Sequence, residues 1–543
     1  MAMSDLGQVD YLVIGGGPAG LQAGYFLQKS GRDYLVVEES DSPGAFFTRF
    51  PRHRTLISSN KVHTGWSDPE MRLRVDWNSL LSDQGPLFTA YSPRYFPPAD
   101  DMVRYLADFA RTHELRIRFN TRITGISRPD GGLFAATDAH GNVVRARRVI
   151  VATGVSRPYL PPIEGAEEAE HYDQVSVDPA EFTDKRVLII GRGNSAFETA
   201  DNLIETAAVI HVAGPGSLKL AWRTHFVGHL RAVNNNFLDT YQLKSQNAVL
   251  DGDILRISRK PDGTYVVSVK FSRVAEVVKD IPYDRVILAT GFRFDASIFD
   301  DDCRPDLVIK DRFPQLTDAW ESVNVPDLYF AGTITQSLDF KKSTSGFIHG
   351  FRYGVKALHR ILERRYHDQE WPHTTLPAAA GPVTEAVIER VNRTSALWQL
   401  FGFLGDAVLV DADGEVRYCE EIPVAHLHEA AARSRFGDLA SYFTVTLEYG
   451  ADHDRVDPFD ITVSRMPQQD TSGLDARYLH PVVRQFLPDG TGKPVAEHHI
   501  TENLENEWDN PDVHVGPLRS FLASRLSAGD DLPAGEEIAA PRA

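Results

Sequence analysis

The residues with the clearest chemical purpose form a glycine-rich turn near the start of the chain, made of Gly15, Gly17, Pro18, Ala19 and Gly20. An apolar run ends at Ile14, and the residues after the turn predict a helix over 21–29. Gly15 allows a sharp turn, Gly17 lets the backbone approach a pyrophosphate, and Gly20 lets a helix pack closely on a strand. Free N–H groups at the start of such a helix attract phosphate. The turn therefore predicts a dinucleotide site.

An acidic residue follows this turn at the distance that a dinucleotide fold requires. A second apolar run, 34–37, ends at Glu38. A carboxylate at the end of the second strand can accept hydrogen bonds from the two hydroxyls of a ribose. Strand, turn, helix, strand and acid together are much more specific than the glycines alone.

A second unit of the same kind is built on Gly191, Gly193, Asn194, Ser195 and Ala196. The sequence predicts a strand over 186–190, a helix over 196–206 and a strand over 209–212. No acid ends that last strand, so the carboxylate of an NAD-specific site is missing. Lys219 and Arg223 could meet a 2′-phosphate, or they are solvated charges, and both interpretations stay open. Two such units predict two dinucleotides, FAD in the first and NADPH or NADH in the second.

Glycines at the ends of three further strands predict how the two units are joined. The strands ending at Gly154 and Gly291 share the sequence Ala-Thr-Gly, and a similar strand ends at Gly332. Strands that stop at glycine beside a cofactor allow the chain to cross between domains there. A helix over 351–364, just after His349, would direct the positive end of its dipole toward a flavin ring.

The expected fold class is α/β, with two dinucleotide-binding (Rossmann-like) domains, the NAD(P) domain inserted in the FAD domain, and an α/β extension at the C-terminus. The prolines between 371 and 383 suggest a linker before that extension. The predicted boundaries are 1–165 and 292–370 for the FAD domain, 166–291 for the NAD(P) domain, 384–526 for the extension and 527–543 for a flexible tail.

Composition limits the classes of partner. The chain has 543 residues and a net charge of −18, which argues against nucleic acid or an anionic membrane as partner. Its two cysteines, Cys303 and Cys419, form no paired motif, and no histidines stand at metal-ligating spacing. The first ten residues lack a signal-peptide pattern and no apolar run reaches the ~20 residues that span a bilayer, so we expect a cytoplasmic protein. An oligomer is compatible with the sequence.

Two stretches carry candidate catalytic or substrate-binding residues. Between 44 and 61 aromatic and basic residues alternate, and Arg52, Ser58 and Asn60 could act at the reactive edge of a flavin. The alternative is a loop with scattered surface arginines. A polar stretch over 221–236 could contact nicotinamide or substrate, although histidines in such segments are usually structural.

The Gly191-Arg-Gly-Asn-Ser-Ala196 turn and the paired Ala-Thr-Gly strands make the chain resemble flavin-containing monooxygenases and related flavoproteins with two dinucleotide sites. It is more closely similar to the FAD-dependent oxidoreductase domain-containing proteins of the endoplasmic reticulum. That similarity rests on residues 47–54, 76–81, 191–200, 238–245 and 346–353. The resemblance implies FAD in the outer domain and NAD(P)H in the inner one, and we expect a bacterial cytosolic homologue.

The resemblance implies an FAD-dependent, NAD(P)H-using monooxygenase that inserts one oxygen atom from O₂ into a small molecule. N-hydroxylation of an amine or amino acid in secondary metabolism is one candidate reaction. The Phe, Gly and His fingerprint that such monooxygenases carry before the second turn is absent. A flavin dehydrogenase or oxidase without oxygen transfer, or a flavoprotein that docks a protein partner through its C-terminal extension, therefore stays open.

Overall fold

The computed structural model describes residues 5–242, 246–273, 277–453, 455–467 and 469–526. The predicted tail, 527–543, and the end of the family-like stretch 238–245 lie outside these residues. The chain divides into two compact units. Unit 1 comprises Met1–His63 and Val75–Val355, and unit 2 comprises Thr64–Arg74 and Lys356–Ala543.

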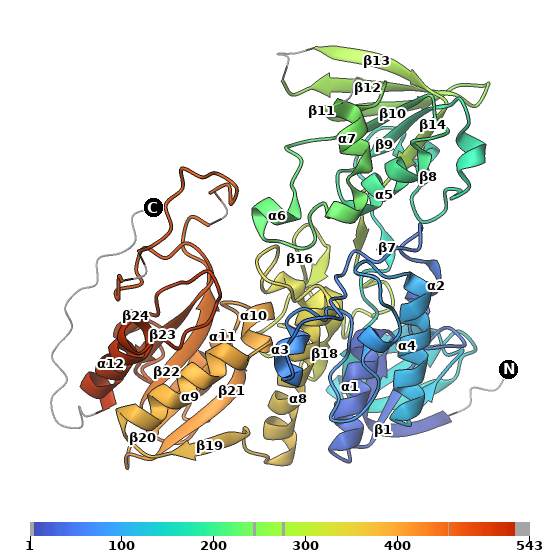
Figure 1. The fold of residues 1–543 in the computed structure, drawn as a ribbon. Coiled ribbons are helices and arrows are strands. Elements are labelled where there is room, and N and C mark those ends of the chain that lie inside the picture. The colour runs from blue at the N-terminus through green and yellow to red at the C-terminus, as the bar shows by residue number, and fades with distance from the viewer. Residues whose placement is uncertain (1–4, 243–245, 274–276, 454, 468, 527–543) are drawn as a thin grey trace. The chain divides into compact units, whose positions relative to one another are not determined.

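The first sheet of unit 1 contains β1 and β18, which are labelled in Figure 1. It has a parallel part around β1 and an antiparallel edge, in the order β3-β2-β1-β6-β5-β4, with β18 also paired to β6. Its strands are β1 (Asp5–Ile14), β2 (Tyr34–Val37), β3 (Ile117–Arg118), β4 (Ile123–Ser127), β5 (Phe134–Asp138), β6 (Val143–Val151) and β18 (Leu328–Phe330). Ile14 pairs with Val37 of β2 and with Val151 of β6, and Phe330 also pairs with Val151. The carboxyl ends of four parallel strands therefore meet at one edge of the sheet.

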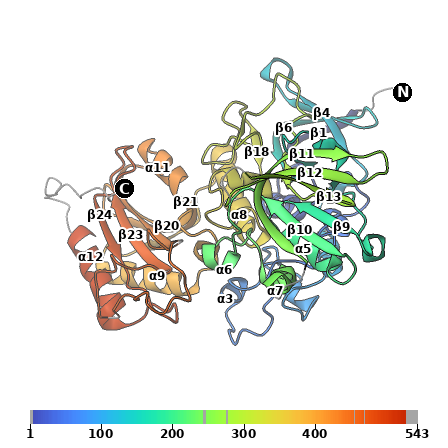
Figure 2. The ribbon, with the colours of Figure 1, turned by 90° about the horizontal axis from the view of Figure 1, so that it is seen from above.

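The second sheet of unit 1 repeats this plan in the order β13-β12-β11-β10-β9-β14-β8. Its strands are β8 (Glu170–His171), β9 (Arg186–Ile190), β10 (Val209–Gly214), β11 (Ala248–Arg259), β12 (Tyr265–Phe271), β13 (Val278–Tyr283) and β14 (Arg285–Leu288). Ile190 pairs with Ala213 of β10 and with Leu288 of β14. Here too, parallel strands end together, while β12 and β13 extend the sheet as an antiparallel edge (Figure 2).

Short strands and helices complete unit 1. The strand pairs are β7 (Arg157–Pro158) with β15 (Phe292–Arg293), and β16 (Leu307–Val308) with β17 (Phe313–Pro314). The helices are α1 (Pro18–Lys29), α2 (Phe46–Arg49), α4 (Ala99–Thr112), α5 (Asn194–Leu203), α6 (Ala221–Thr224), α7 (Asn236–Gln242) and α8 (Ile348–His367), which continues into unit 2. Helices α1 and α5 begin two to three residues before the predicted starts, directly after Gly17 and Gly193. Proline is well suited to the first helical position, because its missing N–H would be unpaired there anyway. The predicted fold of two dinucleotide-binding domains is confirmed.

Unit 2 contains an antiparallel sheet in the order β19-β21-β20-β22-β23-β24. Its strands are β19 (His373–Leu376), β20 (Leu404–Asp411), β21 (Val416–Pro423), β22 (Leu439–Glu448), β23 (His480–Phe486) and β24 (Ala496–His499). Its helices are α3 (Pro69–Leu73), α9 (Ala380–Arg393), α10 (Ala396–Gln399), α11 (Val424–Ala432) and α12 (Gly516–Leu526), and α9 and α12 pack on one another. The α/β extension is thus confirmed. The predicted linker over 371–383 is wrong, because β19 and the start of α9 fall inside it.

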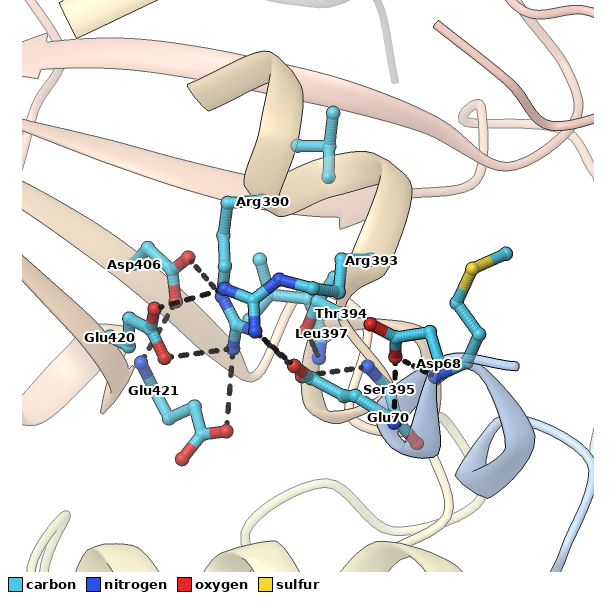
Figure 3. A network of polar contacts seen from close by, with 12 residues as sticks. Asp68, Glu70, Arg390, Arg393, Thr394, Ser395, Leu397, Asp406, Glu420 and Glu421 are labelled. Carbon is cyan, nitrogen blue, oxygen red and sulfur yellow. Dashed lines mark hydrogen bonds and ion pairs between the residues drawn. The ribbon is translucent and has the colours of Figure 1, made fainter. Parts of the chain in front are cut away.

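Unit 2 also holds residues 64–74 from the N-terminal half of the chain, which the sequence did not predict. Figure 3 shows the buried charge network of unit 2 to which Glu70 of this segment contributes. The Arg390 guanidinium lies 2.6 Å from a carboxylate oxygen of Glu70 and 2.9 Å from one of Asp406. Glu421 approaches it at 3.3 Å. The side chains of Arg390, Asp406 and Glu421 are 2%, 0% and 3% exposed, so these are buried ion pairs.

Backbone acceptors hold the same segment in place. The Arg74 guanidinium donates to the carbonyl oxygens of Val391 at 3.1 Å, Asn392 at 2.6 Å and Thr394 at 2.8 Å. Gln399 in turn donates to the Arg74 carbonyl at 2.7 Å. Residues 64–74 are therefore an integral part of unit 2. No helix in the described part of the chain is long and apolar enough to cross a membrane.

Candidate functional site

The first glycine turn has the geometry of a pyrophosphate cradle. Gly15 has φ +109°, and a Cβ added there would lie 2.7 Å from the Ala152 carbonyl oxygen. A Cβ on Gly20 would lie 1.8 Å from the Gly15 carbonyl oxygen, so no larger residue fits. A Cβ on Gly17, by contrast, would meet nothing within 4 Å. The protein's own packing does not require glycine at position 17, which leaves the backbone at the start of α1 open to a phosphate group.

Other residues predicted to bind the first cofactor lie around this turn. A Cβ on Gly332, which has φ +83°, would lie 2.6 Å from the Ala19 Cβ, so the residue after β18 touches the turn. Gly154 follows β6 with φ +66°. The Glu38 carboxylate is buried and accepts hydrogen bonds from the Gly16 N–H at 2.6 Å and the Ser40 N–H at 3.0 Å. Its predicted contact with a ribose stays a prediction.

The second glycine turn repeats the first. Gly191 has φ +139°, and an added Cβ would lie 2.2 Å from the Ala289 carbonyl oxygen. A Cβ on Gly193 would meet nothing within 4 Å, as at Gly17. Ala196 is fully buried, and Gly291 follows β14 with φ +89°. In both turns packing requires glycine at the first position, Gly15 or Gly191, whereas the later glycine, Gly17 or Gly193, faces open space.

Asn194 connects the second turn to the loop between α6 and α7. Its side-chain amide donates to the His229 carbonyl oxygen at 2.9 Å. Its Oδ1 accepts from the Arg231 N–H at 3.0 Å and from the Asn234 amide at 3.2 Å. The predicted nucleotide-binding residue therefore fixes the loop that carries Arg231.

Arg231 brings this loop to the FAD-domain part of unit 1. Its guanidinium donates to Ser59 Oγ at 3.1 Å and lies 5.0 Å from the centre of the Trp77 ring. Burial lowers the pKa of Arg231 from its ordinary value. Trp77 stacks on His349, with ring centres 4.4 Å apart. Ser59, Trp77, Arg231 and His349 thus form a cluster, the Arg231 cluster, in which residues of both nucleotide domains meet.

His349 is the most deeply buried ring of the Arg231 cluster. It is 1% exposed, and neither ring nitrogen has a hydrogen-bond partner within normal limits among the described residues. Burial, followed by the charges of Arg352 and Arg231, holds the pKa of His349 well below its ordinary value, although the nearby Trp77 backbone acts in the other direction. The imidazole is therefore neutral at physiological pH, in the first turn of α8.

The three predicted catalytic residues do not gather in the Arg231 cluster. Ser58 is half-buried and adjoins Ser59 in the chain. The Asn60 amide donates to the carbonyl oxygens of Ser92 at 2.7 Å and Arg94 at 3.2 Å, so its donors are used to tie two loops together.

Arg52 has a different environment. Its guanidinium donates to the Val175 carbonyl oxygen at 2.6 Å, and its backbone N–H donates to the Tyr172 hydroxyl at 3.3 Å. The Tyr172 hydroxyl in turn donates to Glu198. Burial raises the pKa of Glu198 to about 7. Arg52 therefore links the two nucleotide domains at a place separate from the Arg231 cluster. The sequence analysis included Arg231 only within the polar stretch 221–236 and Trp77 only within the family-like stretch 76–81, and it named neither as a site residue.

The predicted 2′-phosphate residues also lie apart from the end of β10. Lys219 and Arg223 are exposed, and the Lys219 carbonyl accepts from the Leu230 N–H at 3.1 Å, which places it with the Arg231 loop. Arg192, inside the glycine turn, instead lies against Gly214 at the end of β10 and forms an ion pair with Asp251 at 2.6 Å. The contact of Lys219 and Arg223 with a 2′-phosphate stays a prediction.

Thiol and metal chemistry have little support in the described residues. Cys303 and Cys419 are both buried, and Cys303 Sγ donates to the Ile126 carbonyl oxygen at 3.1 Å. Burial raises the pKa of each thiol to about 12, so both stay protonated. No group of three or more potential ligands that could hold a metal ion occurs in the ranges that the structure describes.

Comparison with known proteins agrees with this geometry. The model of the pyridine nucleotide-disulphide oxidoreductase family matches residues 12–332. FAD-dependent oxidoreductase domain-containing protein 2 of Mus musculus is 39% identical over 559 residues, which cover 95% of this chain and 84% of that protein. The Danio rerio protein of the same name is 37% identical over 575 residues, with 94% and 82% covered.

Solved structures share the fold of about two thirds of the chain. A flavin-containing monooxygenase from Stenotrophomonas maltophilia aligns with a TM-score of 0.52 and 21% identity, covering 66% of this chain and 99% of that one. Bacillithiol disulfide reductase from Staphylococcus aureus aligns with a TM-score of 0.51 and 18% identity, covering 66% and 100%. The family match and the two glycine turns assign FAD and NAD(P)H as the cofactors. The chain belongs to the pyridine nucleotide-disulphide oxidoreductase family, as an FAD-dependent oxidoreductase similar over almost its whole length to the FAD-dependent oxidoreductase domain-containing proteins.

Proposed function

We propose that this protein is a monooxygenase that uses NAD(P)H and FAD to insert one oxygen atom from O₂ into a small molecule. The observation that carries the proposal is the Arg231 cluster, where a loop fixed by the second glycine turn meets Ser59, Trp77 and His349 of the FAD domain; Ser59 and His349 are buried and Trp77 is half-buried. Oxygen transfer requires a site that excludes water, since water diverts reactive oxygen species to peroxide. Phe347 adds apolar surface next to the cluster, with its ring centre 5.8 Å from that of His349.

The chain's own residues supply binding and positioning. Gly17 and the start of α1 would hold the pyrophosphate of FAD, and Gly193 and the start of α5 that of NAD(P)H. The flavin supplies hydride acceptance and oxygen chemistry. Arg231 keeps a positive charge at Ser59, and neutral His349 offers a hydrogen-bonding nitrogen without a second charge.

A disulfide reductase with its own dithiol is disfavoured, because the two cysteines of the chain belong to different units. An oxidase remains the principal alternative, since a reduced flavin bound beside the same cluster would pass its two electrons to O₂ even without a substrate. A third candidate is a flavoprotein that docks a protein partner through unit 2 and has little turnover of its own. The cytoplasmic location and the bacterial cytosolic origin stay predictions.

Stoichiometry separates these functions. A monooxygenase follows RH + O₂ + NAD(P)H + H⁺ → ROH + NAD(P)⁺ + H₂O, so product should equal NAD(P)H consumed. An oxidase follows NAD(P)H + O₂ + H⁺ → NAD(P)⁺ + H₂O₂. We would screen amines, amino acids and thioethers for stimulated NAD(P)H oxidation, with product mass and peroxide measured together.

The proposal expects one compound that gains 16 mass units in step with NAD(P)H consumption. Peroxide equal to NAD(P)H with every compound would refute it in favour of an oxidase. No oxidation of either nucleotide would favour the docking function. Amines and amino acids come first in the screen, because N-hydroxylation is the candidate reaction that the resemblance favours.

A further inference from the structure

Unit 2 contains a cavity of about 650 Å³ that plays no part in the proposed flavin chemistry. Its walls come from the carboxyl end of α8, the β20–β21 hairpin and the segment after α11. All of these lie within residues 356–543, so the cavity belongs to unit 2 alone. Its size is that of ordinary small-molecule sites, roughly 300–1,000 Å³.

The cavity is lined by guanidinium groups of two kinds. Arg417 is already paired, because it donates to both carboxylate oxygens of Asp411, at 2.9 and 2.7 Å, and to the Phe436 carbonyl at 2.6 Å. Arg364 is half-buried, and its guanidinium carbon lies 3.8 Å from the centre of the Phe436 ring. In the described part of the chain neither Arg364 nor Arg435 forms an ion pair or a side-chain hydrogen bond. Their N–H groups are therefore available to a ligand.

Other positive charges lie near Arg364. Burial, and also the charges of Arg417 and Arg435, lower the pKa of Arg364 from its ordinary value, while Cys419 and Glu370 act in the other direction. The nearby Cys419 thiol is fully buried and protonated, so it offers no negative charge in return. An anion placed here would relieve the repulsion among the guanidinium groups.

The cavity is also lined by carboxylates. Asp368, Glu370, Asp413 and Asp438 line it and, like Arg435, are exposed. Once the Asp411–Arg417 pair is set aside, these four carboxylates outnumber the two free guanidinium groups. A simple dianion would be repelled on entry, whereas a molecule with a carboxylate at one end and a cation at the other matches both sets of side chains.

We propose that this cavity binds a small zwitterion of the basic amino acid class. Its carboxylate contacts Arg364 and Arg435, and its cationic end faces the four exposed carboxylates. Trp371 and Phe436 provide apolar surface for the methylene chain between them. The site is independent of the flavin, so the proposal does not depend on the reaction that the protein catalyses.

Calorimetric titration of the full-length, FAD-loaded protein tests the proposal with three molecules of similar length. L-lysine carries both charge types, glutarate carries two carboxylates, and cadaverine carries two amines. We expect L-lysine to bind about tenfold or more tightly than either of the others, because each of them lacks one charge-assisted contact. No binding of L-lysine at millimolar concentration, or glutarate binding as tightly as L-lysine, would overturn the proposal.

Variants locate the binding in unit 2. Arg364→Met and Arg435→Met should each weaken L-lysine binding about tenfold or more. Arg433→Met is the matched control, because Arg433 is 61% exposed, pairs with Glu429 at 3.0 Å and does not line the cavity. Arg435 is exposed, so its variant remains informative if Arg364→Met fails to fold. L-lysine binding that survives both substitutions would place the ligand elsewhere and refute the assignment.

Discussion

The buried charge network of unit 2 allows a quantitative test at Glu421. Its carboxylate, 3% exposed, lies 2.7 Å from Lys356 Nζ, 3.3 Å from Arg360 and 3.3 Å from Arg390. The substitution Glu421→Gln keeps the shape of the side chain and removes its charge. Lys356, Arg360 and the buried Arg390 would then share one carboxylate fewer.

The size of the effect follows from the proton affinity of the carboxylate. Burial alone would raise the pKa of Glu421, but Lys356, Arg360 and Arg390 outweigh burial and lower it from 4.5 to about 2. That difference corresponds to about 3 kcal/mol of folding free energy. Removing one partner from a buried ion pair costs roughly 3–5 kcal/mol. Because the pKa is depressed, the contribution is fully present above pH 4.5 and is lost as the pH falls toward 2, so Glu421→Gln should lose about 3 kcal/mol at pH 7.

Hydrogen exchange of peptides from β20 and β21 measures this loss without assuming that the whole chain unfolds in one step. The matched control is Glu389→Gln on α9, because Glu389 is 77% exposed and lies 4.0 Å from Arg393. The control should change stability by less than about 0.5 kcal/mol. Adding Lys356→Met to Glu421→Gln should recover part of the loss, since it removes one unbalanced cation.

Equal protection of the β20 and β21 amides in Glu421→Gln and Glu389→Gln would refute the reasoning. It would mean that the network is open to water or that the substituted amide finds neutral partners of equal value. A loss that Lys356→Met fails to reduce would show that packing, not charge balance, is responsible.

Four further experiments test the remaining assignments. Burial raises the pKa of Asp406 to about 6 in spite of Arg390. Wild-type unit 2 should therefore gain stability as the pH falls from about 6 toward 3.8. Hydrogen exchange should show this gain in the wild type and not in Asp406→Asn. Gly17→Val should leave circular dichroism and melting of the apoprotein unchanged, because the added atoms have open space, but should abolish FAD retention; a yellow purified variant would contradict the cradle. Gly193→Val should keep FAD and slow flavin bleaching by NAD(P)H at least about tenfold, and unaltered stopped-flow traces would count against the second turn. Arg231→Met should slow the same bleaching by about 10- to 100-fold while FAD stays bound, and a normal rate would remove Arg231 from the site.

The parts of the fold that sequence alone could predict depend on local physics. Gly15 and Gly191 need positive φ, and Gly20 needs the absence of a Cβ, so each glycine reports a constraint set by residues close to it in the fold. The strand predicted over 34–37 has the observed bounds. A short apolar run bounded by turns is another local signal, and it has few alternatives.

Other features depend on contacts between distant residues and leave little trace in the sequence. Arg231 reaches Ser59 across 172 positions, and Glu70 reaches Arg390 across 320. The prolines between 371 and 383 suggested a linker, yet tertiary pairing with β21 makes 373–376 a strand. The sequence placed Asn60 among the candidates for the reactive edge of a flavin, whereas its amide donors meet the backbone carbonyls of Ser92 and Arg94.

The incorporation of residues 64–74 into unit 2 has a consequence for synthesis on the ribosome. Glu70 leaves the ribosome 320 residues before Arg390 does. At roughly 5–20 residues per second, it waits on the order of 16 to 64 seconds for its partner. The nascent chain can complete its first nucleotide domains during that interval, but Glu70 and Arg74 cannot make these contacts until residues 390–395 emerge. Premature termination anywhere before α9 would leave these two side chains permanently without the acceptors and cations that they meet in the finished protein.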